Sequence, residues 1–252
     1  MKLIIIGSNS SGNSYILDNG KEALLIECGV SFKAIKQALG FSLARVAACI
    51  VTHEHKDHCK AVNDILKGGI KVLTSEQTHK AMGTDGHYNS RFTEKKPQGS
   101  YFKTAFEGFT IQPFTVKHDA AEPVGYLINH EECGNVLFLT DSYYCEYTFK
   151  GLNNVIIEAN YCQKILDDKV AAGVSPEFLR NRVLESHMSL TTCKEMLQAN
   201  DLSQVNNIVL IHLSDSNSDA VRFGKEVREV TGKTVHVAAA GMVIENFNKS
   251  PF

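Results

Sequence analysis

The sequence has no hydrophobic run long enough to cross a membrane. A transmembrane helix needs about 20 successive apolar residues, and the runs in this chain have the length of β-strands. The first run, residues 1–6, is not followed by a small-residue cleavage site, so we expect no signal peptide. We therefore expect a cytoplasmic protein that has no membrane partner.

Disulfide and linker patterns are also missing. The seven cysteines are odd in number and contain no C-x-x-C pair, which argues against a disulfide framework and favours reduced thiols. We expect Cys28 and Cys59 to be small buried residues, although they lie near candidate site residues, and we expect no cysteine to bind metal. No stretch rich in Pro, Gly or Ser divides the chain, so a single domain spanning residues 1–252 is predicted.

The chain lacks a strong charge of either sign, and its formal net charge is −2. This value does not by itself indicate a nucleic-acid-binding protein. Up to Tyr126 the chain has 15 Lys and Arg against 12 Asp and Glu, and beyond it 11 against 16. The first part is therefore mildly basic, which is compatible with a phosphate-bearing substrate but equally with an ordinary solvated surface.

What the sequence does contain is a dense cluster of metal-binding residue types. The apolar run 46–51 predicts a buried strand, and His53, His55, Asp57 and His58 follow it directly. In an extended segment His53 and His55 point to the same side. Imidazole and carboxylate groups are standard ligands of zinc and related metals. The alternative is a solvated loop rich in His and Asp, but the spacing favours a metal site that can hold two ions.

Three further apolar runs lead to a His or an Asp. They precede His118, Asp141 and His212. Where the ends of strands meet at one edge of a sheet, they can assemble a site from distant parts of the sequence. Four other histidines belong to no such motif. We expect His79 and His87 on the surface, and His130 and His236 in structural roles.

Periodicity and turn residues predict the other elements coarsely. Further strands are predicted at residues 3–6, 15–17, 23–26, 70–73, 124–128, 155–157 and 234–238. Helices are predicted at residues 31–39, from near 59 to 68, and at 75–82, 176–185, 192–199 and 219–231. Thr192 and Glu195 have the spacing of a capping box, and residues 83–104 are predicted to be loop-rich. The loop 7–14, Gly-Ser-Asn-Ser-Ser-Gly-Asn-Ser, fits either a backbone anion site or a plain hairpin turn.

The order of these His and Asp residues resembles that of the metallo-β-lactamase superfamily. The resemblance implies an α/β fold of the αββα type, a four-layer sandwich of two mixed β-sheets flanked by helices, with a dinuclear metal centre at one edge. Within the superfamily the chain looks most like the small single-domain bacterial exonucleases of the WalJ type. The segments that carry this likeness are residues 7–14, 116–120, 123–126, 157–161 and 186–189.

The resemblance also implies roles for individual residues. Metal ligands would be His53, His55 and His118 for one ion, Asp57, His58 and His212 for the other, and Asp141 as a bridge between them. Two divalent ions, zinc or manganese with iron as a further option, can share a hydroxide that attacks phosphorus in line.

Two residues would assist the metal ions in catalysis. Asp57 would orient the hydroxide. His187 matches a histidine of the tRNA 3′-processing endonucleases and would protonate the leaving oxygen. A histidine next to a helix can instead help to cap it.

The chain departs from the family pattern at Glu27, where aspartate is usual, and at Ala61, where glycine is usual. Neither change removes a ligand, so they bear on substrate range more than on metal binding.

The expected function is a metal-dependent phosphodiesterase, a DNA exonuclease with no stable protein partner. The alternatives are a hydrolase of a small ester, thioester, lactam or cyclic nucleotide, and a metal-stabilised binding module. The His187 and His212 pair favours phosphodiester cleavage, because lactam- and thioester-cleaving relatives lack the earlier histidine.

Overall fold

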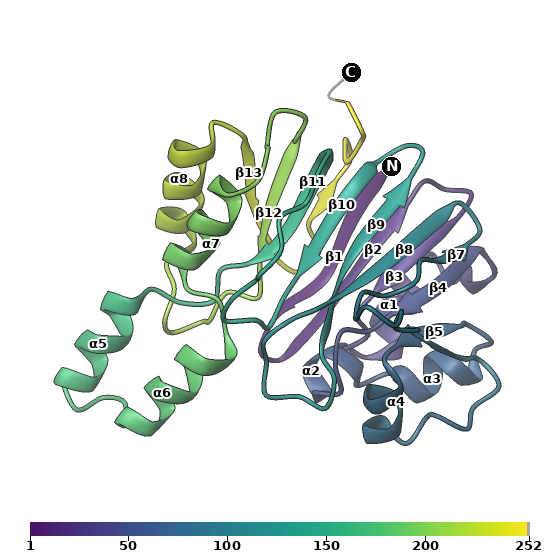
Figure 1. Cartoon of the computed structure of the whole chain (residues 1–252), viewed down its shortest axis with the longest axis horizontal. Coiled ribbons are helices and arrows are strands. Elements are labelled where there is room, and N and C mark those ends of the chain that lie inside the picture. Colours follow the sequence, from purple (N-terminus) through teal and green to yellow (C-terminus); the bar gives the residue numbers. More distant parts are fainter. Residues whose placement is uncertain (251–252) are drawn as a thin grey trace.

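The computed structural model describes residues 1–250, and its strands form two seven-stranded sheets (Figure 1). The first sheet has the order β14 (Val243–Ile244), β1 (Lys2–Asn9), β2 (Gly12–Asp18), β3 (Ala23–Ile26), β4 (Val46–Ile50), β5 (Val72–Thr74), β6 (Ser90–Phe92). The second has the order β13 (Thr234–Val237), β12 (Asn207–Ile211), β11 (Leu152–Glu158), β10 (Gly134–Leu139), β9 (Val124–His130), β8 (Phe109–Thr115), β7 (Thr104–Phe106).

Both sheets are mixed, and each changes from antiparallel to parallel pairing in its middle. In the first sheet the strands from β14 to β3 are antiparallel, and those from β3 to β6 are parallel. In the second sheet the change occurs at β10, which pairs antiparallel with β9 and parallel with β11. Parallel strands bring their carboxyl ends to the same edge, and the segments after β4, β10, β11 and β12 carry the candidate site.

Helices cover the outer face of each sheet. The first sheet is covered by α1 (Phe32–Ala38), α2 (Lys56–Cys59), α3 (Val62–Lys67) and α4 (Glu76–Met82), with a short 3-10 turn at Leu43–Arg45. The second sheet is covered by α7 (Leu190–Gln198) and α8 (Ala220–Thr231). The αββα sandwich predicted from the sequence is therefore confirmed.

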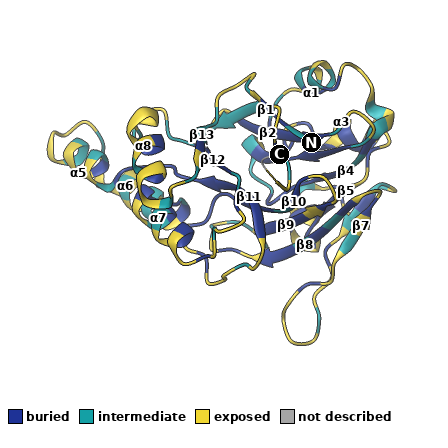
Figure 2. Cartoon of the chain, turned by 90° about the horizontal axis from the view of Figure 1, so that it is seen from above, coloured by how far each residue is buried: buried dark blue, intermediate teal, exposed yellow. Residues whose placement is uncertain are grey.

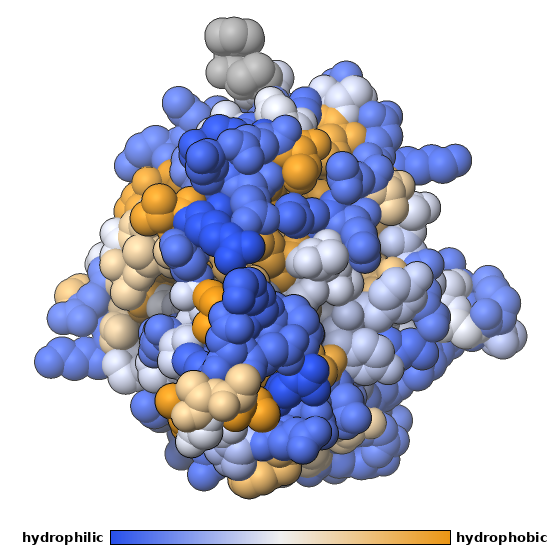
Figure 3. All heavy atoms as spheres, turned by 90° about the vertical axis from the view of Figure 1, so that its left-hand side faces the viewer, coloured by the Kyte–Doolittle hydropathy of each residue, from blue (hydrophilic) through white to orange (hydrophobic). Residues whose placement is uncertain are grey.

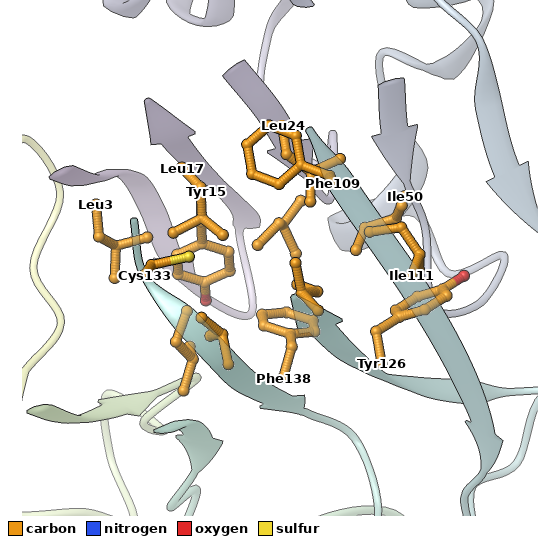
Figure 4. Close-up of a cluster of buried hydrophobic side chains, with 14 of the residues drawn as sticks. Leu3, Tyr15, Leu17, Leu24, Ile50, Phe109, Ile111, Tyr126, Cys133 and Phe138 are labelled. Atoms are coloured by element: carbon orange, nitrogen blue, oxygen red, sulfur yellow. The ribbon is translucent and has the colours of Figure 1, made fainter. Parts of the chain in front are cut away.

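The two sheets pack through a continuous apolar core. Tyr15 on β2 and Phe138 on β10 meet edge to face, with ring centroids 5.7 Å apart (Figure 4). Every residue of β2 and β11 is buried, and Figure 2 shows the strands enclosed by helices whose outer faces are exposed. Strands buried on both faces explain the continuous apolar runs in the sequence.

Two helices project from this body. They are α5 (Gln163–Ala171) and α6 (Glu177–Ser186), and they form a hairpin at the lower left of Figure 1, which we call the arm (residues 163–186). The sequence did not predict α5, because Leu166 is its only buried residue and the apolar periodicity is correspondingly weak. No helix of residues 1–250 is both long and apolar enough to cross a bilayer.

Several predicted boundaries were wrong. Helix α2 begins at Lys56 and not near Cys59, so its first turn includes Asp57. Helix α7 is capped by Ser189, whose side chain accepts a hydrogen bond from the Thr192 N–H at 3.0 Å. Helix α7 therefore begins about one turn before the predicted capping box, and Thr192 and Glu195 lie inside the helix. Strand β6 lies within the segment predicted as loop, and β7 starts at its end.

His79 was wrongly expected on the surface. It is fully buried: its Nδ1 lies 2.8 Å from Thr84 Oγ1, and its Nε2 lies 3.1 Å from the carbonyl oxygen of Arg91 and 3.2 Å from that of Val72. The imidazole joins α4 to β5 and β6. The loop 7–14 is mostly strand, because residues on either side of its turn pair as the hairpin of β1 and β2.

Candidate metal centre

The residues predicted as metal ligands meet at one edge of the sandwich, although they are spread over 160 positions of the chain. His53, His55, Asp57 and His58 follow β4, and His118, Asp141 and His212 follow β8, β10 and β12. Their nitrogen and oxygen atoms form overlapping groups in which all candidate ligand atoms lie within 4.8 Å of one another. The structure thus brings together all seven residues.

The first group consists of three imidazoles, from His53, His55 and His118. His118 Nε2 lies 3.2 Å from His55 Nδ1, and the His53 ring centroid lies 4.6 Å from each of the other two. Two nitrogens bound to one tetrahedral zinc ion are about 3.3 Å apart, so this spacing suits shared coordination. The other nitrogens are held from behind: His53 Nδ1 by Thr52 Oγ1 at 2.9 Å and His118 Nδ1 by the Ser186 carbonyl at 2.9 Å.

The second group consists of Asp57, His58 and His212. Oδ2 of Asp57 lies 3.3 Å from Nε2 of His58 and 3.4 Å from Nε2 of His212. Behind this group, His58 Nδ1 lies 3.5 Å from Glu27 Oε1, and Asn13 Nδ2 lies 3.3 Å from Asp57 Oδ2. A carboxylate behind a histidine, as at His58, is one of the usual ways in which proteins orient metal-binding imidazoles.

Asp141 lies between the two groups. Its Oδ2 is 2.6 Å from His58 Nε2, and it forms a further group with His53 and His58. On its other side, Oδ1 lies 3.1 Å from His212 Nδ1 and 2.8 Å from His187 Nδ1. The carboxylate therefore reaches residues of both groups, as a bridging ligand must.

The donor set fits divalent cations. His53 Nε2 and His212 Nε2 are buried, and neither makes a hydrogen bond within residues 1–250. An unsatisfied buried polar atom costs about 1–3 kcal/mol, so its presence in a cluster of imidazoles and carboxylates indicates a missing partner. A metal ion bound by these nitrogens is the partner that matches their chemistry and spacing.

The charges of the cluster support this interpretation. Burial alone raises the pKa of Asp141, but the charges of His212 and His58 outweigh it and hold that pKa well below its ordinary value. Burial disfavours the charged form of Asp57 as well, and the nearby imidazoles of His212 and His58 nevertheless lower its pKa. Burial also lowers the pKa of His53, which keeps that ring neutral. Ionised carboxylates and neutral imidazole are the forms that bind metal. Burial lowers the pKa of His58 and of His212, but the Asp141 charge outweighs it and raises both, so these two rings must release a proton to bind metal.

Glu158 is a site residue that the sequence analysis missed. It is fully buried at the end of β11, where Oε1 lies 2.8 Å from His187 Nδ1 and 3.0 Å from His212 Nδ1. Oε2 accepts hydrogen bonds from the backbone N–H groups of Met188 at 3.0 Å and Ser142 at 3.3 Å. The available signal was its position after the apolar run 155–157, at the same sheet edge as the other site residues.

His187 lies directly against this cluster. It follows α6, and its Nδ1 is 2.8 Å from both Glu158 Oε1 and Asp141 Oδ1. Burial lowers the pKa of His187, but the Glu158 charge and the hydrogen bond to Asp141 overcome this and raise it to about 9. Candidate ligand atoms of Glu158, Asp141, His187 and His212 also lie within 4.8 Å of one another, so proximity alone allows His187 to act as a ligand or as a proton donor.

Three site residues have unusual backbone conformations. Glu27, Asp141 and His212 have φ values of 60°, 46° and 53°, in the left-handed region that side chains other than glycine seldom adopt. Glu27 and His212 stand one residue after a strand, and Asp141 stands two residues after one. Such conformations cost about 1–3 kcal/mol and persist where the surrounding structure enforces them.

A cleft of about 620 Å³ opens above the cluster. Its floor includes His55, Asp57, His118, Asp141 and His212, and His187 stands at the junction of the floor with the arm. The arm forms one wall. A substrate that enters the cleft can therefore contact the candidate metal ligands and the arm at the same time.

Comparison with known proteins identifies the family. The family model described as "Metallo-beta-lactamase superfamily" matches residues 7–144, which is more than half of the chain. The chain belongs to the metallo-β-lactamase superfamily. The resemblance inferred from the order of His and Asp residues is therefore confirmed, and the chain is a metal-dependent hydrolase of this superfamily.

Two curated members of the superfamily are similar over most of the chain. "Exodeoxyribonuclease WalJ" of Streptococcus pneumoniae is 30% identical over 228 residues, covering 86% of this chain and 83% of the relative. "Exodeoxyribonuclease YycJ" of Bacillus anthracis is 27% identical over 232 residues, covering 85% and 83%. The expected likeness to WalJ-type exonucleases is thus confirmed.

Solved structures of the superfamily share the fold. YhfI from Bacillus subtilis superposes with a TM-score of 0.71 at 17% identity and covers 97% of this chain and 99% of that chain. The short form of human tRNase Z superposes with a TM-score of 0.65 at 15% identity and covers 98% and 99%. At these identities the likeness shows the αββα architecture alone.

Proposed function

We propose that the chain is a metal-dependent phosphodiesterase that degrades DNA from an end, that is, an exonuclease. The observation that carries this proposal is the position of His187, whose imidazole lies beside Asp141 at the edge of the cleft. Its raised pKa favours the protonated form of the ring. Cleavage of a phosphodiester needs a proton on the leaving oxygen, and this residue can supply it. Similarity to two proteins named exodeoxyribonucleases supports the choice of DNA as substrate.

In this proposal the protein holds two divalent ions. His53, His55 and His118 would hold one ion, Asp57, His58 and His212 would hold the other, and Asp141 would be shared between the two sets. When bound, the ions supply Lewis-acid activation of water and neutralise charge on the reacting phosphate. Nitrogen and oxygen donors of this kind suit zinc and manganese, and also iron.

The remaining work is done by side chains of the chain itself. Glu158 accepts hydrogen bonds from both His187 and His212, so one buried carboxylate fixes the orientation of both rings. His187 Nδ1 is occupied by Glu158 and Asp141, which leaves Nε2 to donate a proton into the cleft. Asp57 Oδ1 has no partner within residues 1–250, and this second oxygen of the carboxylate orients the attacking water.

The test is digestion of end-labelled duplex DNA by purified protein loaded with Mn²⁺ or Zn²⁺. Single-stranded DNA, RNA and bis-p-nitrophenyl phosphate serve as parallel substrates. We expect mononucleotides or short products to accumulate from the DNA end, and we expect chelation to abolish the reaction. Metal analysis of the same preparation should give two ions per chain.

Each of the other outcomes points to a different function. Hydrolysis of bis-p-nitrophenyl phosphate with no cleavage of any polynucleotide would indicate a hydrolase of small esters. Internal cuts in RNA without loss of DNA would replace the exonuclease assignment by an endoribonuclease. Metal binding without turnover on any of the substrates would indicate a binding module.

A further inference from the structure

The arm contributes both cationic and apolar side chains to the cleft above the metal centre. Lining residues from the arm include Leu166, Lys169, Val174, Leu179, Arg180 and Arg182. The arm projects away from the sandwich in Figure 1, so these side chains are not needed to cover either sheet. Their place in the cleft therefore calls for an explanation outside the packing of the core.

Two of the three cations fix the arm in position. Arg180 Nε on α6 lies 2.6 Å from Asp167 Oδ1 on α5, which ties the two helices together. Lys169 Nζ donates to Asn217 Oδ1 at 2.9 Å and to the carbonyl of Ser216, which ties α5 to the segment that follows His212. The arm is thus held against the same segment that carries a candidate metal ligand.

Arg182 is the third cation, and its charge is not compensated. The side chain is exposed and lines the cleft. Within residues 1–250 no carboxylate lies within ion-pair distance of its guanidinium. The floor beneath it carries Asp57, Asp119 and Asp141. A free guanidinium on the wall favours an anionic ligand, and the divalent ions of the proposed function would offset the carboxylates of the floor beneath it.

Apolar side chains lie beside these charges on the same wall. Val174 is 73% exposed and Leu179 is 42% exposed, and both line the cleft. Figure 3 faces the arm and shows hydrophobic patches set among hydrophilic side chains. A ligand that matches such a wall has negative charge and a flat apolar part, and a nucleotide has both in its phosphate and its base.

We propose, on the basis of the function proposed above, that Arg182 is a specificity-determining residue that binds a phosphate of the nucleic-acid strand next to the scissile bond. Val174 and Leu179 pack against the adjoining nucleoside. The arm thereby distinguishes a polynucleotide from a small phosphodiester, which reaches the floor of the cleft but has no second phosphate for Arg182.

The experiment compares Arg182→Ala, Arg182→Lys and the control Lys164→Ala in the Mn²⁺-loaded protein. Lys164 lies on the same arm, pairs with Asp168 and does not line the cleft. Substrates are a short fluorescein-labelled single-stranded DNA and bis-p-nitrophenyl phosphate. A charge-assisted hydrogen bond to phosphate corresponds to roughly a 10–100-fold change in binding, so Arg182→Ala should raise KM for the DNA by about that factor.

Three further readings complete the test. The loss of kcat/KM on DNA should exceed that on bis-p-nitrophenyl phosphate by about tenfold or more, and Arg182→Lys should recover part of it. The slope of log KM against the logarithm of the salt concentration should fall by about 0.7 in Arg182→Ala, because one phosphate contact is lost. Lys164→Ala should match the wild type.

The outcomes separate this proposal from the proposed function. If the wild type cleaves DNA and Arg182→Ala has an unchanged KM and salt slope, Arg182 does not bind the strand, and the exonuclease function stands. If Arg182→Ala loses activity equally on both substrates, the residue supports the metal centre, and the specificity role is wrong. If the wild type cleaves no polynucleotide, the proposed function fails, and this inference fails with it.

Discussion

Gly29 lies against the backbone of Asp57, so closely that a Cβ atom at position 29 would overlap the Asp57 carbonyl oxygen. This contact joins the segment after β3 to helix α2, which carries the candidate ligands Asp57 and His58. Gly29→Ala should push α2 away from its place, destabilise the fold by about 1–3 kcal/mol and weaken metal binding. Thermal unfolding and the metal content of the purified variant measure the two effects.

Gly86→Ala is the matched control for this substitution. A Cβ at Gly86 would meet nothing within 4 Å. We expect that variant to keep the metal content of the wild type. Equal metal content and equal melting temperatures in both variants would show that the backbone at Asp57 tolerates displacement.

Glu158 joins His187 to His212, and Glu158→Gln should separate its role from that of a metal ligand. The amide keeps the volume but loses the charge and one acceptor oxygen, so both imidazoles lose a fixed anionic partner. Removing such a supporting group typically costs about 10–100-fold in metal affinity or activity. The measurement is kcat/KM for bis-p-nitrophenyl phosphate together with the metal content.

Glu226→Gln is the control, because Glu226 pairs with Lys194 and Arg222 at the surface of α8. Partly exposed ion pairs contribute little, so this variant should behave as the wild type. An unchanged kcat/KM in Glu158→Gln would mean that Asp141, whose Oδ1 lies 2.8 Å from His187 Nδ1 and 3.1 Å from His212 Nδ1, is enough to orient the two rings.

The sequence predicted for a physical reason that the candidate ligands would lie together. His118 and Asp141 each stand two residues after an apolar run, and such runs are typical of buried strands, whose ends can meet at one sheet edge. Glu158 follows the same rule, but a single carboxylate does not reveal that it accepts hydrogen bonds from His187 and His212. Its role depends on contacts across 29 and 54 positions of the chain.

Helix α5 and the burial of His79 were missed for the opposite reason. Helix α5 buries only Leu166, so it lacks the periodic apolar face by which a helix is predicted from sequence, whereas α6 lies close to the helix predicted at residues 176–185. His79 lies in a polar neighbourhood of the sequence, and only the pairing of β5 with β6 encloses it. Local composition describes the neighbours in the chain, whereas burial depends on neighbours in space.

His187→Ala should lose turnover and retain metal. General acid catalysis contributes about 10²–10⁴-fold, so kcat on DNA should fall by that factor. The proton matters less for p-nitrophenolate, which leaves readily without protonation, so the loss on bis-p-nitrophenyl phosphate should be smaller. If turnover and metal content fall together, His187 is a ligand, as its place in the group with Asp141, Glu158 and His212 allows.

His79 should make the stability of the fold depend on pH. Burial lowers the pKa of His79 below the ordinary value of about 6.5, so the native fold holds the ring neutral. Below that value the unfolded chain takes up a proton that the native fold excludes, and the stability contributed by the neutral ring is lost as the pH falls through the native pKa. His79→Gln removes this titration along with the hydrogen bonds to Thr84 and Arg91.

The free energy of unfolding in urea should therefore differ most between wild type and variant at about pH 8. This difference should shrink below pH ~6.5, by at most about 1.4 kcal/mol per pH unit. The titrations of the metal-centre histidines are common to both proteins and cancel in this difference. A difference that stays constant from about pH 8 to pH 5 would mean that His79 takes up its proton without leaving its site.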